Sequence, residues 1–376
     1  MITVFEKKNI LDLEPITVNK TSIDIMYGPH SMFNRIENIS QLKISAITVR
    51  HSLQGLMEKK YPKVLVNPDI DSNKIWLNGS VYWESHLLKK IINDSNTVLV
   101  NNGEIIGLNY DSNDFNMDIL HQENGYMLLP PKVRILKVEA CLINFPWDIL
   151  NLIPKIIEDI KQYPEDISVD KNVQIDESNG PVIIEKSAVI EPFVYLKGPL
   201  YIGSGATILS HSKIEKSVIG PITKIKGEVY GCIFQGYSNK AHEGYIGNSF
   251  IGEWVNIGAG STFSNLRNDY KTISMKVNNK YIDTKSLFLG SIIGDYSKLA
   301  IGTQLNTGTN IGIGCNVISH KFPSRFIPLF SLYYNDKIKR IEFDKFIKTL
   351  SIMKKRRNKK LFDYEVKFLK FLFNLL

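Results

Sequence analysis

The stretch Glu228–Lys271 gathers the side chains of this sequence that are best suited to chemistry. It contains one histidine, His242, a glutamate fourteen positions earlier (Glu228), several side-chain amides and a lysine at its end (Lys271). A neutral imidazole can remove a proton from an attacking nucleophile near neutral pH, which contributes roughly 10²–10⁴-fold to a rate. Glycines and small residues alternate here with regularly spaced aliphatics, so we expect chemistry built on a structural repeat.

A six-residue repeat is clearest on either side of this stretch. The upstream aliphatics are Ile184, Ile190, Leu196, Ile202, Ile208 and Ile214, and the downstream ones are Ile293, Leu299, Leu305, Ile311 and Val317. A second register of small or aliphatic residues lies two positions before each of them. Hexapeptide repeats predict a parallel β-helix, in which each hexad forms one side of a coil and its aliphatic residue points into the core. In the left-handed form, three hexads complete one triangular coil.

The chain of 376 residues, 43% of them hydrophobic, is long enough for two domains and a tail. Before the repeat, short apolar runs alternate with polar or helical stretches, which predicts an α/β domain. We therefore expect an α/β domain at 1–150, a linker helix at 151–165, a left-handed β-helix at 166–330 and a helical tail at 335–376.

Charge and cysteine content narrow the class of protein. No signal-like or membrane-spanning apolar run appears, so we expect a cytoplasmic chain without an integral membrane segment. Cys141, Cys232 and Cys315 suit reduced thiols. Much of the net charge of +8 lies in Lys354–Lys360, which we interpret as a solvated helix face, with phosphate-rich ligands or an acidic membrane surface as alternatives. No nucleic-acid-binding motif is present.

The motifs KAH, YIG, VNIGAGS and SNL, followed by a lysine, resemble the acetyltransferase half of the GlmU-like enzymes, which acetylate glucosamine-1-phosphate and then uridylylate it. LEPITVNKTSIDIMYG, FPWDILN and FPSRFIPLFS are similar to a divergent Bacteroidetes-type group that joins a sugar-nucleotidyltransferase-like domain to the β-helix. The resemblance implies a homotrimer with active sites between neighbouring prisms, small-molecule sugar partners and acetyl-CoA as cosubstrate.

The resemblance also implies roles for single residues. His242 matches the catalytic base, and Glu228 matches the carboxylate that orients it. The residues that match the sugar-phosphate site are Tyr245, Asn256 and Lys271, and those that match the acetyl-CoA site are Ala259, Gly260, Asn265 and Ser291. The alternatives are a structural histidine at a coil corner, an asparagine ladder and a solvated lysine. Leu266 departs from the family, whose members carry tyrosine there.

The N-terminal domain departs further from an active nucleotidyltransferase. That chemistry needs a glycine-rich loop near the N-terminus to bind phosphates, but the first glycine here is Gly28. The related group has Thr-Arg where this chain has Asn19 and Lys20. Asp24 or Asp69 could bind Mg²⁺, which we expect only if this domain is active.

Three classes of function remain. The first is acetyl-CoA-dependent acylation of an amino-sugar phosphate or a nucleotide-linked amino sugar. The second is sugar-1-phosphate nucleotidyl transfer, with the β-helix serving assembly or regulation. The third is a scaffold or a zinc enzyme of the γ-carbonic-anhydrase kind. His211, His242 and His320 lack the close spacing of zinc ligands, so we expect no metal site in the β-helix.

Overall fold

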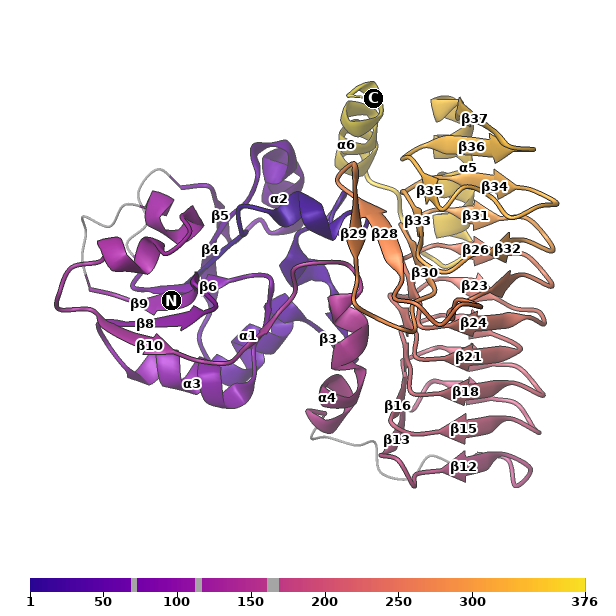
Figure 1. Ribbon diagram of the computed structural model, residues 1–376, viewed down its shortest axis with the longest axis horizontal. Coiled ribbons are helices and arrows are strands. Elements are labelled where there is room, and N and C mark those ends of the chain that lie inside the picture. Colours follow the sequence, from indigo (N-terminus) through magenta and orange to yellow (C-terminus); the bar gives the residue numbers. More distant parts are fainter. Residues whose placement is uncertain (69–72, 112–116, 161–168, 376) are drawn as a thin grey trace. The chain divides into compact units, whose positions relative to one another are not determined.

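A computed structural model of the chain describes residues 1–68, 73–111, 117–160 and 169–375 (Figure 1). It divides into two units. The first unit comprises Met1–Leu11, Asn19–Ile25 and His30–Asn144, and the second comprises Asp12–Val18, Met26–Pro29 and Phe145–Leu376.

A seven-stranded sheet with the order β10-β8-β9-β6-β1-β4-β5 forms the first unit. Its strands are β1 (Ile2–Phe5), β4 (Ile44–Thr48), β5 (Leu65–Val66), β6 (Ile75–Asn78), β8 (Thr97–Asn101), β9 (Glu104–Asn109) and β10 (Arg134–Lys137). Its helices are α1 (Met32–Ser40), α2 (Gln54–Lys60) and α3 (Ser85–Asn93). The short strands of this unit are β3 (His30–Ser31), β7 (Val81–Tyr82) and β11 (Cys141–Leu142), whereas β2 (Met26–Tyr27) belongs to the second unit. β1 is parallel to β4 and β6, whereas β9 is antiparallel to β6 and β8. The predicted α/β class is confirmed.

Three sheets form the β-helix of the second unit, visible as stacked coils in Figure 1, and their strands are parallel except for the last strand of the third sheet. The first sheet contains β12 (Gln174–Asp176), β15 (Tyr195–Lys197), β18 (Lys213–Glu215), β21 (Glu228–Tyr230), β24 (Tyr245–Gly247), β27 (Thr262–Phe263) and β32 (Gln304–Leu305). The second contains β13 (Val182–Ile184), β16 (Leu200–Ile202), β19 (Val218–Ile219), β22 (Ile233–Phe234), β25 (Phe250–Ile251), β30 (Ser291–Ile293), β33 (Thr309–Ile311) and β35 (Phe326–Ile327). The third contains β14 (Val189–Ile190), β17 (Thr207–Ile208), β20 (Lys224–Ile225), β23 (Asn239–Lys240), β26 (Asn256–Ile257), β31 (Lys298–Leu299), β34 (Asn316–Ile318), β36 (Ser331–Tyr334) and β37 (Lys337–Arg340).

The strand register confirms the left-handed β-helix predicted from the hexads. Leu196 pairs with Ile214 in the first sheet, so aliphatics of equal phase stack from coil to coil. Both side chains are fully buried in one continuous apolar core. Burying apolar surface contributes about 25 cal/mol per Å², and each coil buries its core face only against its neighbours. Cys232 and Cys315 fill this core as free thiols, and burial raises the pKa of each to about 12.

Helices and a hairpin accompany the coils. The helix predicted between the domains corresponds to α4 (Ile153–Glu158), and residues 161–168 lie outside the described residues. After Lys271 the chain leaves the coils and forms a hairpin of β28 (Ser274–Val277) and β29 (Lys280–Asp283). The tail contains α5 (Phe343–Lys355) and α6 (Asp363–Asn374). The helix predicted from the start of the tail is wrong for its first residues, because β37 pairs with the free edge of β36 before α5 begins.

A column of aromatic residues holds α5 against the coils. Tyr237, Trp254 and Tyr296 occur at successive coil corners, and Phe330 follows after one intervening corner at Gly314; all four aromatic residues have a positive φ. The rings of Tyr237 and Trp254 stack with centroids 4.4 Å apart. Phe346 of α5 meets Tyr296 and Phe330 edge to face, within the same apolar cluster. The aromatic column therefore fixes where the N-terminal part of α5 lies.

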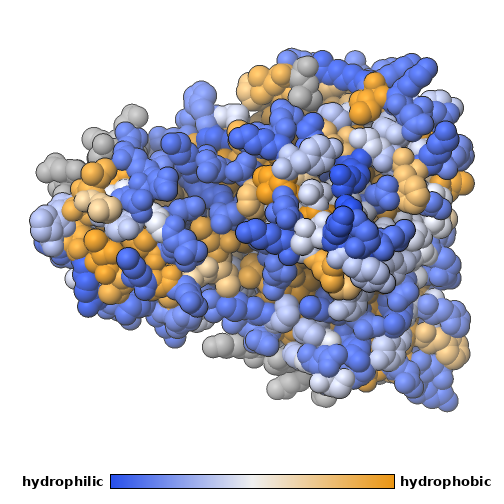
Figure 2. Space-filling model, viewed as in Figure 1, coloured by the Kyte–Doolittle hydropathy of each residue, from blue (hydrophilic) through white to orange (hydrophobic). Residues whose placement is uncertain are grey.

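The face of the molecule in Figure 2 is mainly hydrophilic, with separate apolar areas. No helix among the described residues is long and apolar enough to cross a membrane.

Candidate functional site

A coil turn after β23 carries His242, whose side chain is exposed. Two residues earlier, Lys240 occupies an inward place that pairs with Ile225, and its side chain is 1% exposed. Its Nζ donates hydrogen bonds of 2.7 Å to the carbonyl oxygens of Lys226 and His242. Burial lowers the pKa of Lys240 to about 8, and the charge of Glu243 opposes this shift. The lysine therefore ties the backbone of the histidine turn to the coil below.

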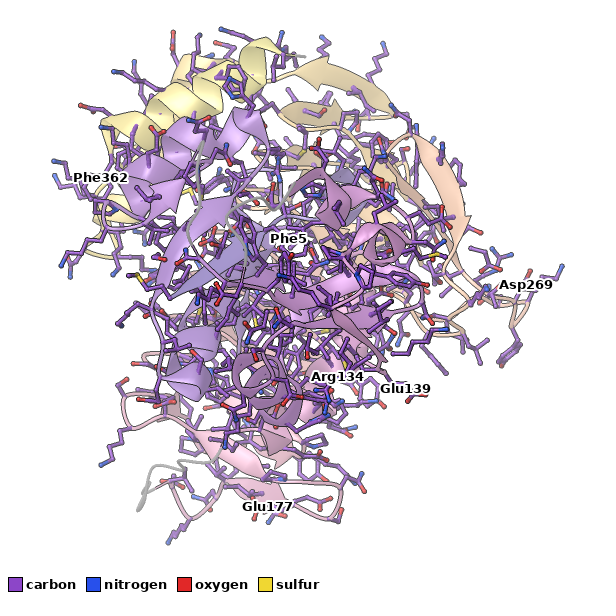
Figure 3. All side chains as sticks on the ribbon, turned by 90° about the vertical axis from the view of Figure 1, so that its left-hand side faces the viewer. Phe5, Arg134, Glu139, Glu177, Asp269 and Phe362 are labelled. Carbon is purple, nitrogen blue, oxygen red and sulfur yellow. The ribbon has the colours of Figure 1, made fainter. Side chains whose placement is uncertain are left out.

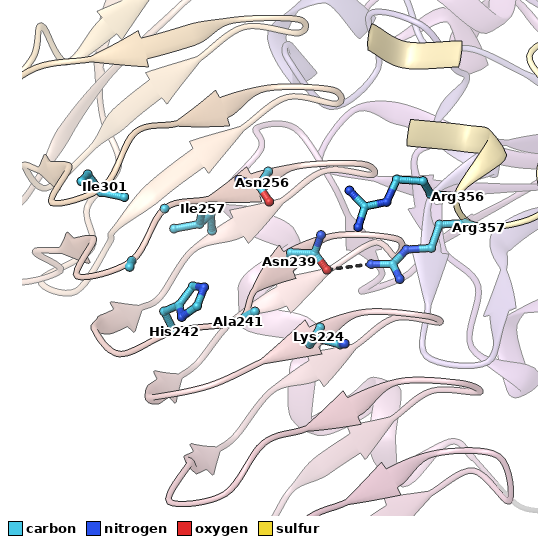
Figure 4. A pocket seen from close by; sticks show the side chains of 11 residues that line it. Lys224, Asn239, Ala241, His242, Asn256, Ile257, Ile301, Arg356 and Arg357 are labelled. Carbon is cyan, nitrogen blue, oxygen red and sulfur yellow. Dashed lines mark hydrogen bonds between the residues drawn. The ribbon is translucent and has the colours of Figure 1, made fainter. Parts of the chain in front are cut away.

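His242, Asn256 and Ala259 line one cavity of about 410 Å³ (Figure 4). They come from adjacent coils, because Asn239 pairs with Asn256 in the third sheet. Asn256 points outward from its strand and is exposed. The structure thus brings together three of the predicted site residues, one each for the base, the sugar and the cofactor. Gly260, which follows Ala259, adopts the left-handed backbone conformation with a φ of 71°.

A second group of predicted residues meets on the first sheet. Tyr245 lies beside Glu228 on the neighbouring strand, and a Cβ at Gly247 would collide with the Tyr245 hydroxyl and the Asn265 amide. The Asn265 Nδ2 donates a hydrogen bond of 2.7 Å to Asn248 Oδ1. Burial raises the pKa of Tyr245 to about 12, so its hydroxyl is a neutral donor near pH 7. The absence of a side chain at Gly247 lets this phenol and this amide lie together.

Glu228 has a different neighbour from the one expected. Its Oε1 lies 3.5 Å from Lys213 Nζ, and both side chains are about half exposed. No contact among the described residues joins Glu228 to His242. The role of this carboxylate in orienting the imidazole stays a prediction.

Lys271 and Ser291 lie apart from the cavity. Lys271 is 77% exposed on a loop, with its Nζ 3.9 Å from Asp269. Asp269, which also accepts two hydrogen bonds from Arg267, stands on a segment that projects from the strands (Figure 3). Ser291 is fully buried on β30, and its hydroxyl has no hydrogen-bond partner among the described residues.

Sequence reasoning missed several residues that line the cavity. These are Lys224 and Asn239 from the third sheet, Ile301 from a coil corner, and Arg356 and Arg357 at the end of α5. A signal existed for the first two, because Lys224, Asn239 and Asn256 occupy the same outward place on successive coils. No such signal existed for the arginines, since their position depends on how α5 packs.

The predicted magnesium ligand of the first unit is already paired. Asp24 accepts hydrogen bonds from Lys60 Nζ at 2.6 Å, from the Tyr61 hydroxyl, and from the backbone N–H and hydroxyl of Thr21. Burial raises the pKa of Asp24, but Lys60, Tyr61 and Thr21 outweigh burial and lower it overall. Asp69 lies outside the described residues. No group of three His, Cys, Asp or Glu side chains in the described part of the chain could hold a metal ion. The oxygens of Asp24 are therefore already occupied by donors from the protein itself.

The fold and the site define a hexapeptide-repeat β-helix joined to a nucleotidyltransferase-like unit. Residues 2–164 match the family described as sugar nucleotidyl transferase. A bifunctional sugar-1-phosphate nucleotidylyltransferase/acetyltransferase of Sulfurisphaera tokodaii is 32% identical over 194 residues, which cover 48% of this chain and 46% of that protein. The bifunctional protein GlmU of Methanococcus aeolicus is 34% identical over 189 residues, which cover 47% of this chain and 43% of that protein. The chain is therefore similar to the sugar nucleotidyl transferase family over residues 2–164, and part of it is similar to bifunctional proteins of the GlmU kind.

These matches span somewhat less than half the length of the curated relatives. Among solved structures, a mutant of perosamine N-acetyltransferase from Caulobacter crescentus, in complex with CoA and GDP-perosamine, aligns at 16% identity. The alignment covers 46% of this chain and 58% of that protein, with a TM-score of 0.21.

Proposed function

We propose that the β-helix is an acetyl-CoA-dependent acyltransferase with His242 as general base. Its acceptor is an amino-sugar phosphate or a nucleotide-linked amino sugar, used in nucleotide-sugar and cell-envelope polysaccharide synthesis. The observation that carries this proposal is the cavity that His242 shares with Asn256 and Ala259. An exposed imidazole beside an amide and a small residue suits a reaction between a sugar and the end of a long, narrow thioester.

The reaction follows from what each group can do. The acceptor nitrogen attacks the thioester carbonyl carbon, and His242 takes the proton that this nitrogen loses. A carbon–nitrogen bond forms, the carbon–sulfur bond breaks, and the imidazolium returns a proton so that CoA leaves as the thiol. The two hydrogen bonds of Lys240 limit movement of the turn that carries the base.

We assign the remaining predicted residues to the two substrates, with one exception. Those for the acceptor are Tyr245, Asn256 and Lys271, and those for acetyl-CoA are Ala259, Gly260 and Asn265. Ser291, predicted for the same cofactor, is fully buried, so we do not assign its side chain to a substrate. Glu228 is the proposed partner of the imidazole. Its ion pair with Lys213 is long and half exposed, and such surface pairs contribute little, so the carboxylate is available for another partner.

We also propose that the protein is a homotrimer and that it is cytoplasmic, as the sequence analysis predicted. Ile301 lines the cavity and is 77% exposed. Contact with the β-helix of a second subunit, or with the pantetheine arm of acetyl-CoA, would shield the Ile301 side chain from water. Because burial of an apolar side chain is favourable, we expect one of these two partners at the cavity.

Thiol release from acetyl-CoA, measured with a panel of amino-sugar phosphates and nucleotide amino sugars, tests the proposal. We expect turnover with one acceptor and a loss of roughly 10²–10⁴-fold in His242→Ala. His320→Ala is the matched control, because His320 is also exposed but does not line the cavity. Equal turnover by wild type and His242→Ala would refute the assignment of the base.

The match of residues 2–164 to a sugar nucleotidyl transferase family favours a second candidate function. In that case the first unit would join a sugar-1-phosphate to a nucleoside triphosphate and release pyrophosphate. The full pairing of Asp24 argues against a metal at that carboxylate. Pyrophosphate release with silence in the thiol assay would make the first unit the enzyme.

A further inference from the structure

Two arginines from the end of α5 form the wall of the cavity opposite His242. Figure 4 shows the Arg356 and Arg357 side chains reaching from the helix end toward the asparagines of the third sheet. Arg357 Nη2 donates a hydrogen bond of 2.8 Å to Asn239 Oδ1. The basic segment that the sequence suggested to be a solvated helix face therefore lies in part against the coils.

The position of this segment is fixed by packing on both sides of it. Phe346 and Leu350 of α5 are buried in the aromatic cluster that includes Trp254. Lys354, which is 7% exposed, donates a hydrogen bond to Glu365 of α6. These contacts hold the C-terminal end of α5 in place, so less freedom of the backbone that carries the two arginines is lost when they bind a ligand.

The cavity has an excess of positive charge. Lys224, Arg356 and Arg357 line it, and none of the described residues that line it is acidic. No ion pair is formed by either arginine among the described residues. Guanidinium groups are planar and rigid, and they bind phosphate oxygens through two parallel hydrogen bonds. A cavity that pairs such groups with a general base suits a substrate that carries a phosphate near its reacting group.

We propose that Arg356 and Arg357 form a phosphate-binding subsite of the His242 cavity, supplied by the C-terminal tail of the same chain. This inference rests on the proposed function, because the cavity is taken as the site of acyl transfer. Asn239 keeps Arg357 directed into the cavity, and Lys224 adds charge one coil below. The ligand is a phosphate ester, which either substrate could carry: the acceptor sugar phosphate, or CoA through its 3′-phosphate.

Direct binding to the full-length protein, measured by isothermal titration calorimetry, tests the subsite. The probes form two pairs, CoA with dephospho-CoA and glucosamine-1-phosphate with glucosamine. We expect the Arg356→Gln/Arg357→Gln double variant to bind one phosphorylated probe roughly ten- to a hundred-fold more weakly than wild type. In the double variant, the phosphorylated and the unphosphorylated member of one pair should bind with similar affinity. That pair identifies which substrate carries the phosphate. Inorganic pyrophosphate is a further probe, and we expect it to bind wild type more tightly than the double variant.

Lys355→Gln is the matched control, because Lys355 lies in the same basic segment, is exposed and does not line the cavity. We expect its affinities to equal those of wild type. Arg357→Lys keeps the charge but cannot form the two-pronged contact, so we expect an intermediate loss. Unchanged binding of every probe by a folded double variant would overturn the subsite.

The outcomes separate this inference from the proposed function. Arginine-dependent binding without any acyl transfer supports the subsite and refutes the acyltransferase. Acyl transfer that needs His242 but not the arginines, with unchanged affinities, refutes the subsite alone.

Discussion

Replacing Lys240 by methionine tests whether the buried ammonium group of Lys240 is desolvated in the folded chain. Lys240 is a cation at a place where the hexad repeat puts an aliphatic residue, and its side chain is almost fully buried. Methionine has a similar length and no charge. The substitution removes the hydrogen bonds to the carbonyl oxygens of Lys226 and His242 and leaves them without this donor.

The two effects of this substitution oppose each other at neutral pH. Burial lowers the pKa of Lys240 from 10.5 to about 8, which corresponds to about 3 kcal/mol against the charged form in the folded state. Loss of the donor costs roughly 1–3 kcal/mol for each of the two carbonyls that stays unpaired. At pH 7 this cost and the relief of the buried charge largely offset each other, so the informative quantity is how stability depends on pH.

The sign of that dependence follows from proton binding. Below pH 8 both the folded and the unfolded chain hold the proton, so the full cost is present. Between pH 8 and 10.5 the folded chain releases the proton while the unfolded chain keeps it, so the stability of wild type rises relative to Lys240→Met. We expect a relative gain of up to about 3 kcal/mol across this interval.

Urea unfolding of wild type and Lys240→Met at pH 7, 8, 9 and 10, at one protein concentration, measures this difference. Lys186→Met is the control, since Lys186 is exposed and its replacement should leave the curve parallel to wild type. Parallel curves for Lys240→Met and wild type would refute the reasoning, because they would mean that the ammonium is not desolvated.

Two further predictions concern the cores of the two units. Phe234 is fully buried in the β-helix, so Phe234→Ala should lower the free energy of unfolding by about 3–5 kcal/mol, with a smaller loss in Phe234→Leu, measured by urea unfolding. A loss below about 1 kcal/mol would contradict the tight packing of that coil. Lys60→Met should cost the first unit about 2–3 kcal/mol, because Asp24 keeps a buried charge without its cation. Since the pKa of Asp24 is lowered below 3.8, this difference should be present above that pH and shrink as the pH falls below it, whereas a pH-independent difference would count against the ion pair.

The sequence alone was sufficient for the β-helix and for part of its site. The six-residue period determines which side chains face inward, so Leu196 and Ile214 could be placed in the core from the repeat itself. The same period separates His242 from Asn256 by about one coil, which predicts that they are neighbours in space. The α/β character of the first unit followed from the alternation of apolar and polar runs.

Only the tertiary structure decided which distant groups share the site. The sequence could have indicated that Lys240 points inward, because it pairs with the inward-pointing Ile225 of the preceding coil. Its hydrogen bond to the carbonyl of His242, however, depends on the geometry of the turn at that corner. The positions of Arg356 and Arg357 depend on the aromatic column at the coil corners, which binds α5 through contacts far apart in the sequence. A local repeat fixes where side chains point, whereas the docking of a tail depends on surfaces that exist only after the coils have stacked.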